Sequence, residues 1–166
     1  MNLLLGSKND FGVEIKATGK SNHGSLMGYA RLWFGGNFFG TINSYIFLDG
    51  YLLGGLYQML RTKYLNDVSF PEDVTEQFLY FKRRSNDLED DEIDWYRFDC
   101  GTMTDDFYNW TYRKDDCLTI IWKIRDQPNK YHEDLLGYPQ SVFSYQIKYD
   151  DFKELVERLD RLLKNW

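Results

Sequence analysis

The chain has 166 residues, a length that suits one domain, 1–166, with a sizeable hydrophobic core. Its 20 Lys and Arg against 26 Asp and Glu give a formal net charge of −6, which argues against binding to nucleic acid or to an anionic membrane. Five Trp, thirteen Tyr and twelve Phe favour a fold rich in β-structure, because aromatic side chains pack well on a pleated surface.

The first part of the chain predicts short strands. Phe11 and Val13 begin an alternation of apolar with small or polar residues, which is typical of a strand over 11–17 with one wet face. A second strand, nearly apolar on both faces, is predicted over 26–34, and a short third strand over 38–42. Turn residues separate these strands and a fourth one in "YIFL", at 19–24, 35–37, 43–44 and 49–50.

A helix is predicted over 51–65 because apolar residues recur there at helical spacing. These residues are Leu52, Leu53, Leu56, Met59, Leu60 and Tyr64. Gly54 and Gly55 each weaken such a helix by roughly 1 kcal/mol relative to alanine. We expect both to be tolerated because a neighbouring backbone passes close to them.

The remainder of the chain predicts further strands and one more helix. Strands are predicted over 76–82 (after a start signal at Ser69 or Pro71), 95–100, 107–113, 117–125 and 141–149. Short polar turns join three of them into an antiparallel meander, with 117–125 as a central strand. The last helix, over 151–165, has one apolar stripe and begins with Asp151 as N-cap and Glu154 three residues later. The fold class is α+β: a mostly antiparallel β-sheet with the helices at about 51–65 and 151–165 packed against it.

The glycine-rich stretch "GGNFFG" at 35–40 does not predict a phosphate site. It lacks the lysine of a P-loop and the spacing of a dinucleotide fingerprint, so a hairpin turn is the better interpretation. Arg31 is the only basic residue between Lys20 and Arg61, which disfavours a stacking platform for nucleic-acid bases. His23 and His132 stand outside metal-ligand spacing, so neither a metal nor a cofactor is predicted.

The two cysteines, Cys100 and Cys117, are interpreted as buried free thiols of a reducing cytosol. The start "MNLLLGSKND" does not read as a signal peptide, and no apolar run is long enough for a membrane span. We therefore expect a cytoplasmic protein. One alternative remains open: a small hydrolase in which either cysteine pairs with His132.

Acidic residues concentrate in two parts of the sequence. The run "DLEDDEID" contains Asp87, Glu89, Asp90, Asp91, Glu92 and Asp94. A second acidic patch is predicted from Asp105, Asp106, Asp115 and Asp116. A solvated charged face is the simplest interpretation. The functional interpretation is that these ten carboxylates steer a basic protein partner toward the chain.

Three stretches resemble a known class of proteins: "YARLWFGGNFFGT" at 29–41, "IFLDGYLLGGL" at 46–56, and "DDFYNWTYR…LTIIWKI" at 105–124. They are similar to the immunity proteins of bacterial polymorphic toxin and contact-dependent growth inhibition systems, and among the numbered families to the forty-second. The resemblance implies a non-enzymatic inhibitor that binds and neutralises a cognate toxin C-terminal domain, such as a basic nuclease. A domain that binds a peptide along a sheet edge is the other alternative to an enzyme.

Overall fold

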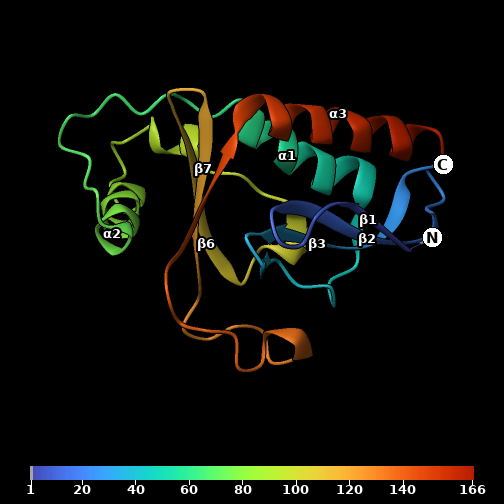
Figure 1. Ribbon diagram of the computed structural model, residues 1–166. Helices are drawn as coiled ribbons and strands as arrows, with labels where there is room; N and C mark the ends of the chain where they lie inside the picture. Colours follow the sequence, from blue (N-terminus) through green and yellow to red (C-terminus); the bar gives the residue numbers. More distant parts are fainter. Residues whose placement is uncertain (1) are drawn as a thin grey trace.

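The computed structural model describes residues 2–166 and has two antiparallel sheets with three α-helices (Figure 1). The first sheet contains β1 (Asn2–Gly6), β2 (Phe11–Lys20), β3 (Leu26–Phe34), β4 (Asn37–Phe39) and β5 (Ile46–Phe47). Its order is β1-β2-β3-β4, and β5 also pairs with β3. The second sheet has the order β6-β7-β8 and consists of β6 (Phe107–Lys114), β7 (Cys117–Ile124) and β8 (Phe143–Lys148). The α+β class is confirmed, with two sheets in place of the single one expected; Met1 lies outside the described residues.

The longer helices lie on different sides of the second sheet. They are α1 (Leu53–Leu60), α2 (Val74–Ser85) and α3 (Tyr149–Lys164). Short helical turns are η1 (Leu48–Leu52), η2 (Ile93–Tyr96), η3 (Gly101–Met103) and η4 (Glu133–Leu135). Figure 1 shows α1 and α3 side by side, with α2 beyond the β6–β7 hairpin. None of the helices within residues 2–166 has the length and apolarity that crossing a membrane requires.

The hydrophobic residues form two clusters that meet at β7. The main core joins both sheets to α1 and α3, and includes Val13, Leu56, Ile120 and Phe152. The second cluster lies between α2 and the other face of the second sheet, and it consists of Phe78, Phe81, Ile93, Tyr96, Trp110, Tyr112 and Ile121. Strand β7 is therefore buried on both faces and lies between β6 and β8, as predicted for a central strand.

The clearest sequence patterns of the first sheet, an alternation of apolar residues and a pair of turn glycines, lie in the elements that they predict. Phe11, Val13 and Ile15 are buried along β2, and Val13 pairs with Leu32 of β3. Gly35 and Gly36 both have positive φ, which is the turn geometry that a two-residue hairpin between β3 and β4 requires. The expected hairpin is thus confirmed.

Several predicted elements are wrong. Residues 76–82 belong to helix α2, whose N-cap is Asp73 and not Ser69 or Pro71. The predicted strand 95–100 is the end of η2, followed by residues 97–100 without regular secondary structure. The predicted turn at 49–50 lies in η1, so the first helical segment runs from 48 to 60 and stops short of 65.

Three smaller corrections concern ends and glycines. Helix α3 begins at Tyr149 without a side-chain cap, so Asp151 lies inside its first turn. Strand β1 was not predicted at all. A β-carbon on Gly55 would lie 2.6 Å from the carbonyl oxygen of Asp99, which confirms the close backbone there, whereas nothing lies within 4 Å of such an atom on Gly54.

Candidate functional site

The first acidic run forms the turn after α2 and enters η2. Three of its carboxylates form ion pairs: Asp90 with Arg84, Glu92 with Lys63, and Asp94 with Arg97. Asp90 accepts hydrogen bonds from Arg84 Nε at 2.5 Å and Nη2 at 3.0 Å. This bidentate contact holds the pKa of Asp90 below its usual range. Asp87, Glu89, Asp91, Glu92 and Asp94 are exposed. The structure therefore leaves five of the six carboxylates of this run at the surface.

The second predicted patch is divided by the length of β6. Asp105 and Asp106 precede the strand, whereas Asp115 and Asp116 form the turn after it. Eight residues of strand separate the two pairs by about 26 Å at ~3.3 Å per residue. These four residues therefore lie at two separate places on the molecule.

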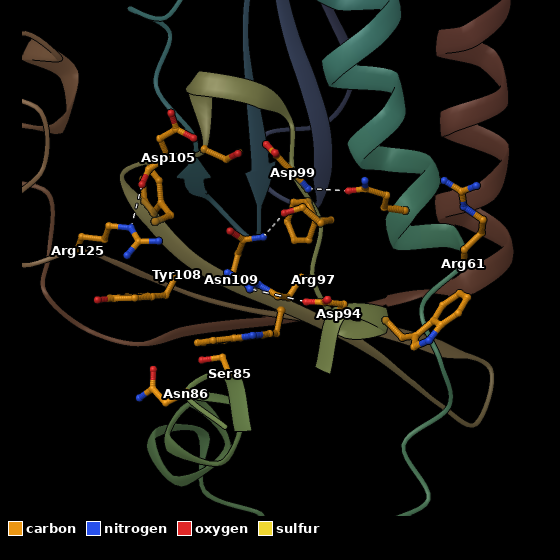
Figure 2. A pocket seen from close by; sticks show the side chains of 16 residues that line it. Arg61, Ser85, Asn86, Asp94, Arg97, Asp99, Asp105, Tyr108, Asn109 and Arg125 are labelled. Atoms are coloured by element: carbon orange, nitrogen blue, oxygen red, sulfur yellow. Dashed lines mark hydrogen bonds and ion pairs between the residues drawn. The ribbon is translucent and has the colours of Figure 1, made fainter. Parts of the chain in front are cut away.

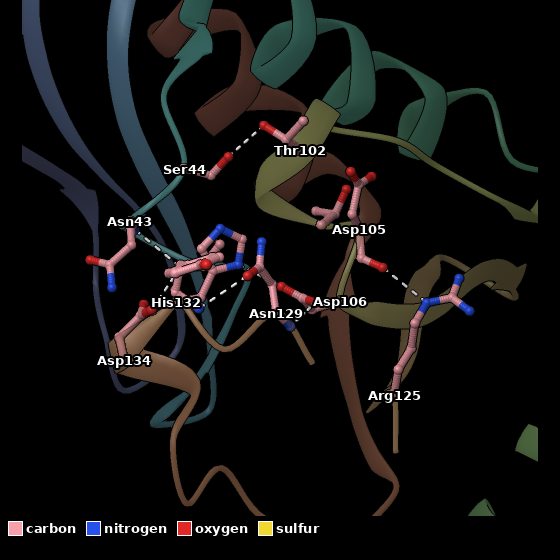
Figure 3. A network of polar contacts seen from close by, with 12 residues as sticks. Asn43, Ser44, Thr102, Asp105, Asp106, Arg125, Asn129, His132 and Asp134 are labelled. Atoms are coloured by element: carbon pink, nitrogen blue, oxygen red, sulfur yellow. Dashed lines mark hydrogen bonds and ion pairs between the residues drawn. The ribbon is translucent and has the colours of Figure 1, made fainter. Parts of the chain in front are cut away.

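Asp106 is buried and holds a loop in place. Its Oδ2 contacts His132 Nδ1 at 2.6 Å, and its Oδ1 accepts the backbone N–H of Asn129 at 2.7 Å (Figure 3). Asp134 anchors the same excursion to the connection between β4 and β5, where it accepts the hydroxyl of Thr41 at 2.6 Å and the N–H of Ile42 at 2.9 Å. The excursion between β7 and β8 is thus tied down by two carboxylates.

Both thiols are free, and neither forms the Cys–His pair of the hydrolase alternative. His132 contacts Asp106, whereas the Cys100 thiol faces the carbonyl oxygen of Leu52. Burial raises the pKa of Cys100, which keeps it a thiol. Cys117 is half-buried, not buried as predicted, and it lies at the far end of β6–β7. Within residues 2–166, no three His, Cys, Asp or Glu side chains converge as a set of metal ligands.

A cleft of about 890 Å³ lies along the free edge of β6, between the C-terminal end of α2 and the segment 97–99 (Figure 2). It brings Asp94 of the first run together with Asp105 of the second. Asp99 also lines it, a residue that the sequence did not single out. Three arginines are the cations of its lining: Arg61, Arg97 and Arg125.

Local packing fixes the wall of this cleft that carries Asp99. The N–H of Asp99 donates to Gln58 Oε1 at 2.8 Å, and Asn109 Nδ2 donates to the carbonyl oxygen of Phe98 at 2.7 Å. Gly55 lets the helix α1 approach this segment closely. The glycine pair in the predicted helix was the one signal of this contact in the sequence.

The charges of the cleft are unevenly paired. Arg97 Nη1 lies 3.8 Å from Asp94 Oδ1. The guanidinium of Arg125 lies 4.2 Å from the ring centroid of Tyr108, and its Nε donates to the carbonyl oxygen of Asp105 at 2.9 Å. Burial and then the charges of Asp99 and Asp106 raise the pKa of the Asp105 carboxyl, against the weaker opposing effect of Arg125. The Asp105 carboxyl therefore takes up a proton more readily than an exposed carboxyl does.

An exposed tryptophan lies in the lining of the same cleft. The side chain of Trp95 is 53% exposed, and the ammonium of Lys63 lies 5.0 Å from its ring centroid. Tryptophan is enriched among the residues that contribute most of the binding energy of protein interfaces. The cleft thus combines carboxylates, arginines and an aromatic anchor, which suits binding to a protein segment.

No protein-family model matches this sequence, and no curated protein sequence matches it. Among solved structures, the crystal structure of CdiI from Burkholderia dolosa AUO158 is similar, with a TM-score of 0.66 and 13% sequence identity. The similarity covers 95% of this chain and 97% of that chain. Both proteins therefore share one fold over nearly their whole lengths.

Proposed function

We propose that this chain is an immunity protein that binds and neutralises a cognate toxin domain. The observation that carries the proposal is its similarity to CdiI, an immunity protein of contact-dependent growth inhibition, over 95% of the chain. In this proposal the chain acts by binding to the toxin domain and not as an enzyme. Membership of the forty-second numbered family stays a prediction.

The surface chemistry supports a protein partner that carries positive charge. The net charge is −6, and the exposed carboxylates of 87–94 extend to a cleft that also holds Asp99 and Asp105. Complementary charge speeds the encounter of two proteins and selects between partners. A basic toxin, such as a nuclease, fits this surface. Two free thiols fit a reducing compartment, so the proposal places the protein in the cytoplasm.

Co-expression tests the function. The chain is produced together with the C-terminal domain of the large protein encoded immediately upstream, and growth and co-purification are measured. We expect growth inhibition by that domain alone, rescue by this chain, and a stable complex. A non-cognate toxin domain is the matched control and should not be neutralised. A toxic upstream domain that this chain neither binds nor neutralises would refute the proposal.

Salt dependence tests the charge of the partner. We expect the association rate to fall as ionic strength rises, because steering acts over a Debye length of about 10 Å at 0.1 M salt. An association rate that does not change between low and high salt would show that the acidic surface does not steer the toxin.

A further inference from the structure

Strand β6 is an edge strand, and half of its backbone groups point away from the sheet. The two-residue turn Asp115–Asp116 makes Lys114 and Cys117 the first hydrogen-bonded pair of the β6–β7 hairpin. Every second residue back from Lys114 pairs in the same way, so the residues between them direct N–H and C=O outward. Arg113 shows this direction: its N–H donates to the carbonyl oxygen of Lys63 and its carbonyl oxygen accepts from Leu65.

The outward N–H and C=O groups of β6 have hydrogen-bond partners at both ends of the strand but not along the cleft. The carbonyl oxygen of Thr111 accepts the hydroxyl of Thr62 at 2.7 Å, and the N–H of Phe107 donates to Thr104. Between these points, no backbone group of residues 2–166 meets the outward N–H and C=O of Asn109 or the outward N–H of Thr111. The lining of the cleft includes residues 107–110, so this open edge lies along it. Unpaired groups of a strand edge are a template for one more strand.

A second donor in the lining is also unsatisfied. Trp110 is 2% exposed, and its indole N–H has no hydrogen-bond partner among residues 2–166. Buried donors without a partner are uncommon in folded proteins.

Two carboxylates, Asp99 and Asp105, lie above the open edge, and Arg125 is the cation next to Asp105. Figure 2 shows Asp99 and Asp105 along one rim of the cleft, with Asn109 below them. Arg97 and Arg125 already contact Asp94 and Tyr108, respectively. Alternate side chains of a strand added to β6 would point toward this rim, because side chains alternate between the faces of a sheet.

We propose that the cleft binds one extended, basic segment of the toxin domain, which pairs with the edge of β6 at Asn109 and places a lysine or arginine between Asp99 and Asp105. Main-chain hydrogen bonds provide the affinity in this mode of binding, and the side chains that reach the rim provide the specificity. The inference rests on the proposed function, since it names the surface that the toxin would occupy.

Two substitutions at one position isolate the main-chain contact. Asn109→Ala removes the side chain but keeps the outward N–H, whereas Asn109→Pro removes the N–H as well at an edge where proline is tolerated. The probe is the upstream toxin domain, titrated by calorimetry. We expect Asn109→Pro to bind at least tenfold more weakly than Asn109→Ala, and equal affinities would overturn the proposal.

Amide hydrogen exchange of the unaltered chain gives a second readout that does not depend on a variant that folds. The amides of Asn109 and Thr111 should exchange slowly only in the complex with the toxin domain. Unchanged exchange at both amides in a formed complex would overturn the proposed strand pairing.

Removal of the two carboxylate charges at the rim tests whether they contribute to binding of the toxin domain. The double variant Asp99→Asn with Asp105→Asn should bind the toxin domain at least tenfold more weakly. The matched control is Asp115→Asn with Asp116→Asn, at the far end of β6, which should change affinity less than twofold. A complex that tolerates the rim variant would overturn this inference and leave the proposed function standing. Failure of the unaltered chain to bind any toxin domain would overturn both.

Discussion

The two adjacent glycines of α1 predict opposite effects of the same substitution. A β-carbon added at Gly54 meets no atom within 4 Å. Alanine there should stabilise the protein by about 1 kcal/mol, the difference in helix propensity between the two residues. A β-carbon added at Gly55 lies 2.3 Å from Cys100 Sγ and 2.6 Å from the carbonyl oxygen of Asp99. Both distances are far inside van der Waals contact.

The loss of stability expected for Gly55→Ala depends on which part of the chain must move to make room for the new β-carbon. A carbonyl oxygen of the main chain cannot rotate away, so the segment that carries Asp99 must shift as a whole. Overpacking of this kind costs about 3 kcal/mol at the upper end of its usual range, which the gain in helix propensity reduces to a net loss of about 2 kcal/mol. The two alanine variants should therefore differ by about 3 kcal/mol in the free energy of unfolding.

Urea denaturation followed by tryptophan fluorescence measures this difference. With a slope of about 2 kcal/mol per M, the midpoints of the two variants should lie about 1.5 M apart. Adding Cys100→Ala to Gly55→Ala should recover only part of the loss, because the contact with the Asp99 carbonyl remains. Equal midpoints for the two single variants would refute the close approach of α1 to segment 97–99, and with it the positioning of the cleft wall.

Three further outcomes follow from contacts outside α1. Asp73→Ala should destabilise the protein by about 1 kcal/mol in the same urea assay, because Asp73 Oδ1 caps α2 by accepting the N–H of Glu76 at 3.0 Å; an unchanged midpoint would contradict the cap. Arg84 lowers the pKa of Asp90 in the folded state, so the stabilising effect of this carboxylate is present above the unfolded pKa of about 4 and is lost as pH falls through the folded value. Below pH 4 the free energy of unfolding of Asp90→Asn should therefore fall less steeply than that of the unaltered protein. Parallel curves for the two proteins would refute the ion pair. Under native conditions a thiol reagent should modify half-buried Cys117 but not Cys100. The reaction should be slow at neutral pH, because burial and then Asp116 raise the pKa of Cys117. Cys117→Ser should abolish labelling of the native protein, and labelling that persists in this variant would show that Cys100 is accessible.

The sequence predicts best the elements whose type follows from the spacing of their own apolar residues. The alternation beginning at Phe11 fixes one buried face of β2, and the apolar stripe of 151–165 places α3 on the core. Residues 76–82 are part of helix α2 and not of the predicted strand, although Phe78 and Phe81 are of a residue type that favours strands. Their spacing of three residues, and Glu76 three residues after the capping Asp73, were the available signals of a helix.

The cleft could not be predicted, because its parts come together only in the folded chain. Asp94 and Asp105 lie in separate acidic runs, and Asp99 lies between them in a segment that was expected to be a strand. Their meeting depends on the contact of Gly55 with Asp99, which lies far along the chain. Asp106, by contrast, was counted among the surface acids because nothing in the sequence near it shows that His132 would cover it.

The open length of β6 is a feature that folded proteins usually remove. An unpaired strand edge invites pairing with another copy of the chain, and natural proteins cover such edges or place charges beside them. Here the helix α2 packs on one face of the second sheet and the main core on the other, so both faces are filled while the edge stays open at Asn109. Asp99 and Asp105 stand beside it, and a second copy of the chain would bring its own two carboxylates to the same rim. The proposed basic segment would instead place its cation between Asp99 and Asp105, so the two charges that disfavour self-association there would favour this partner.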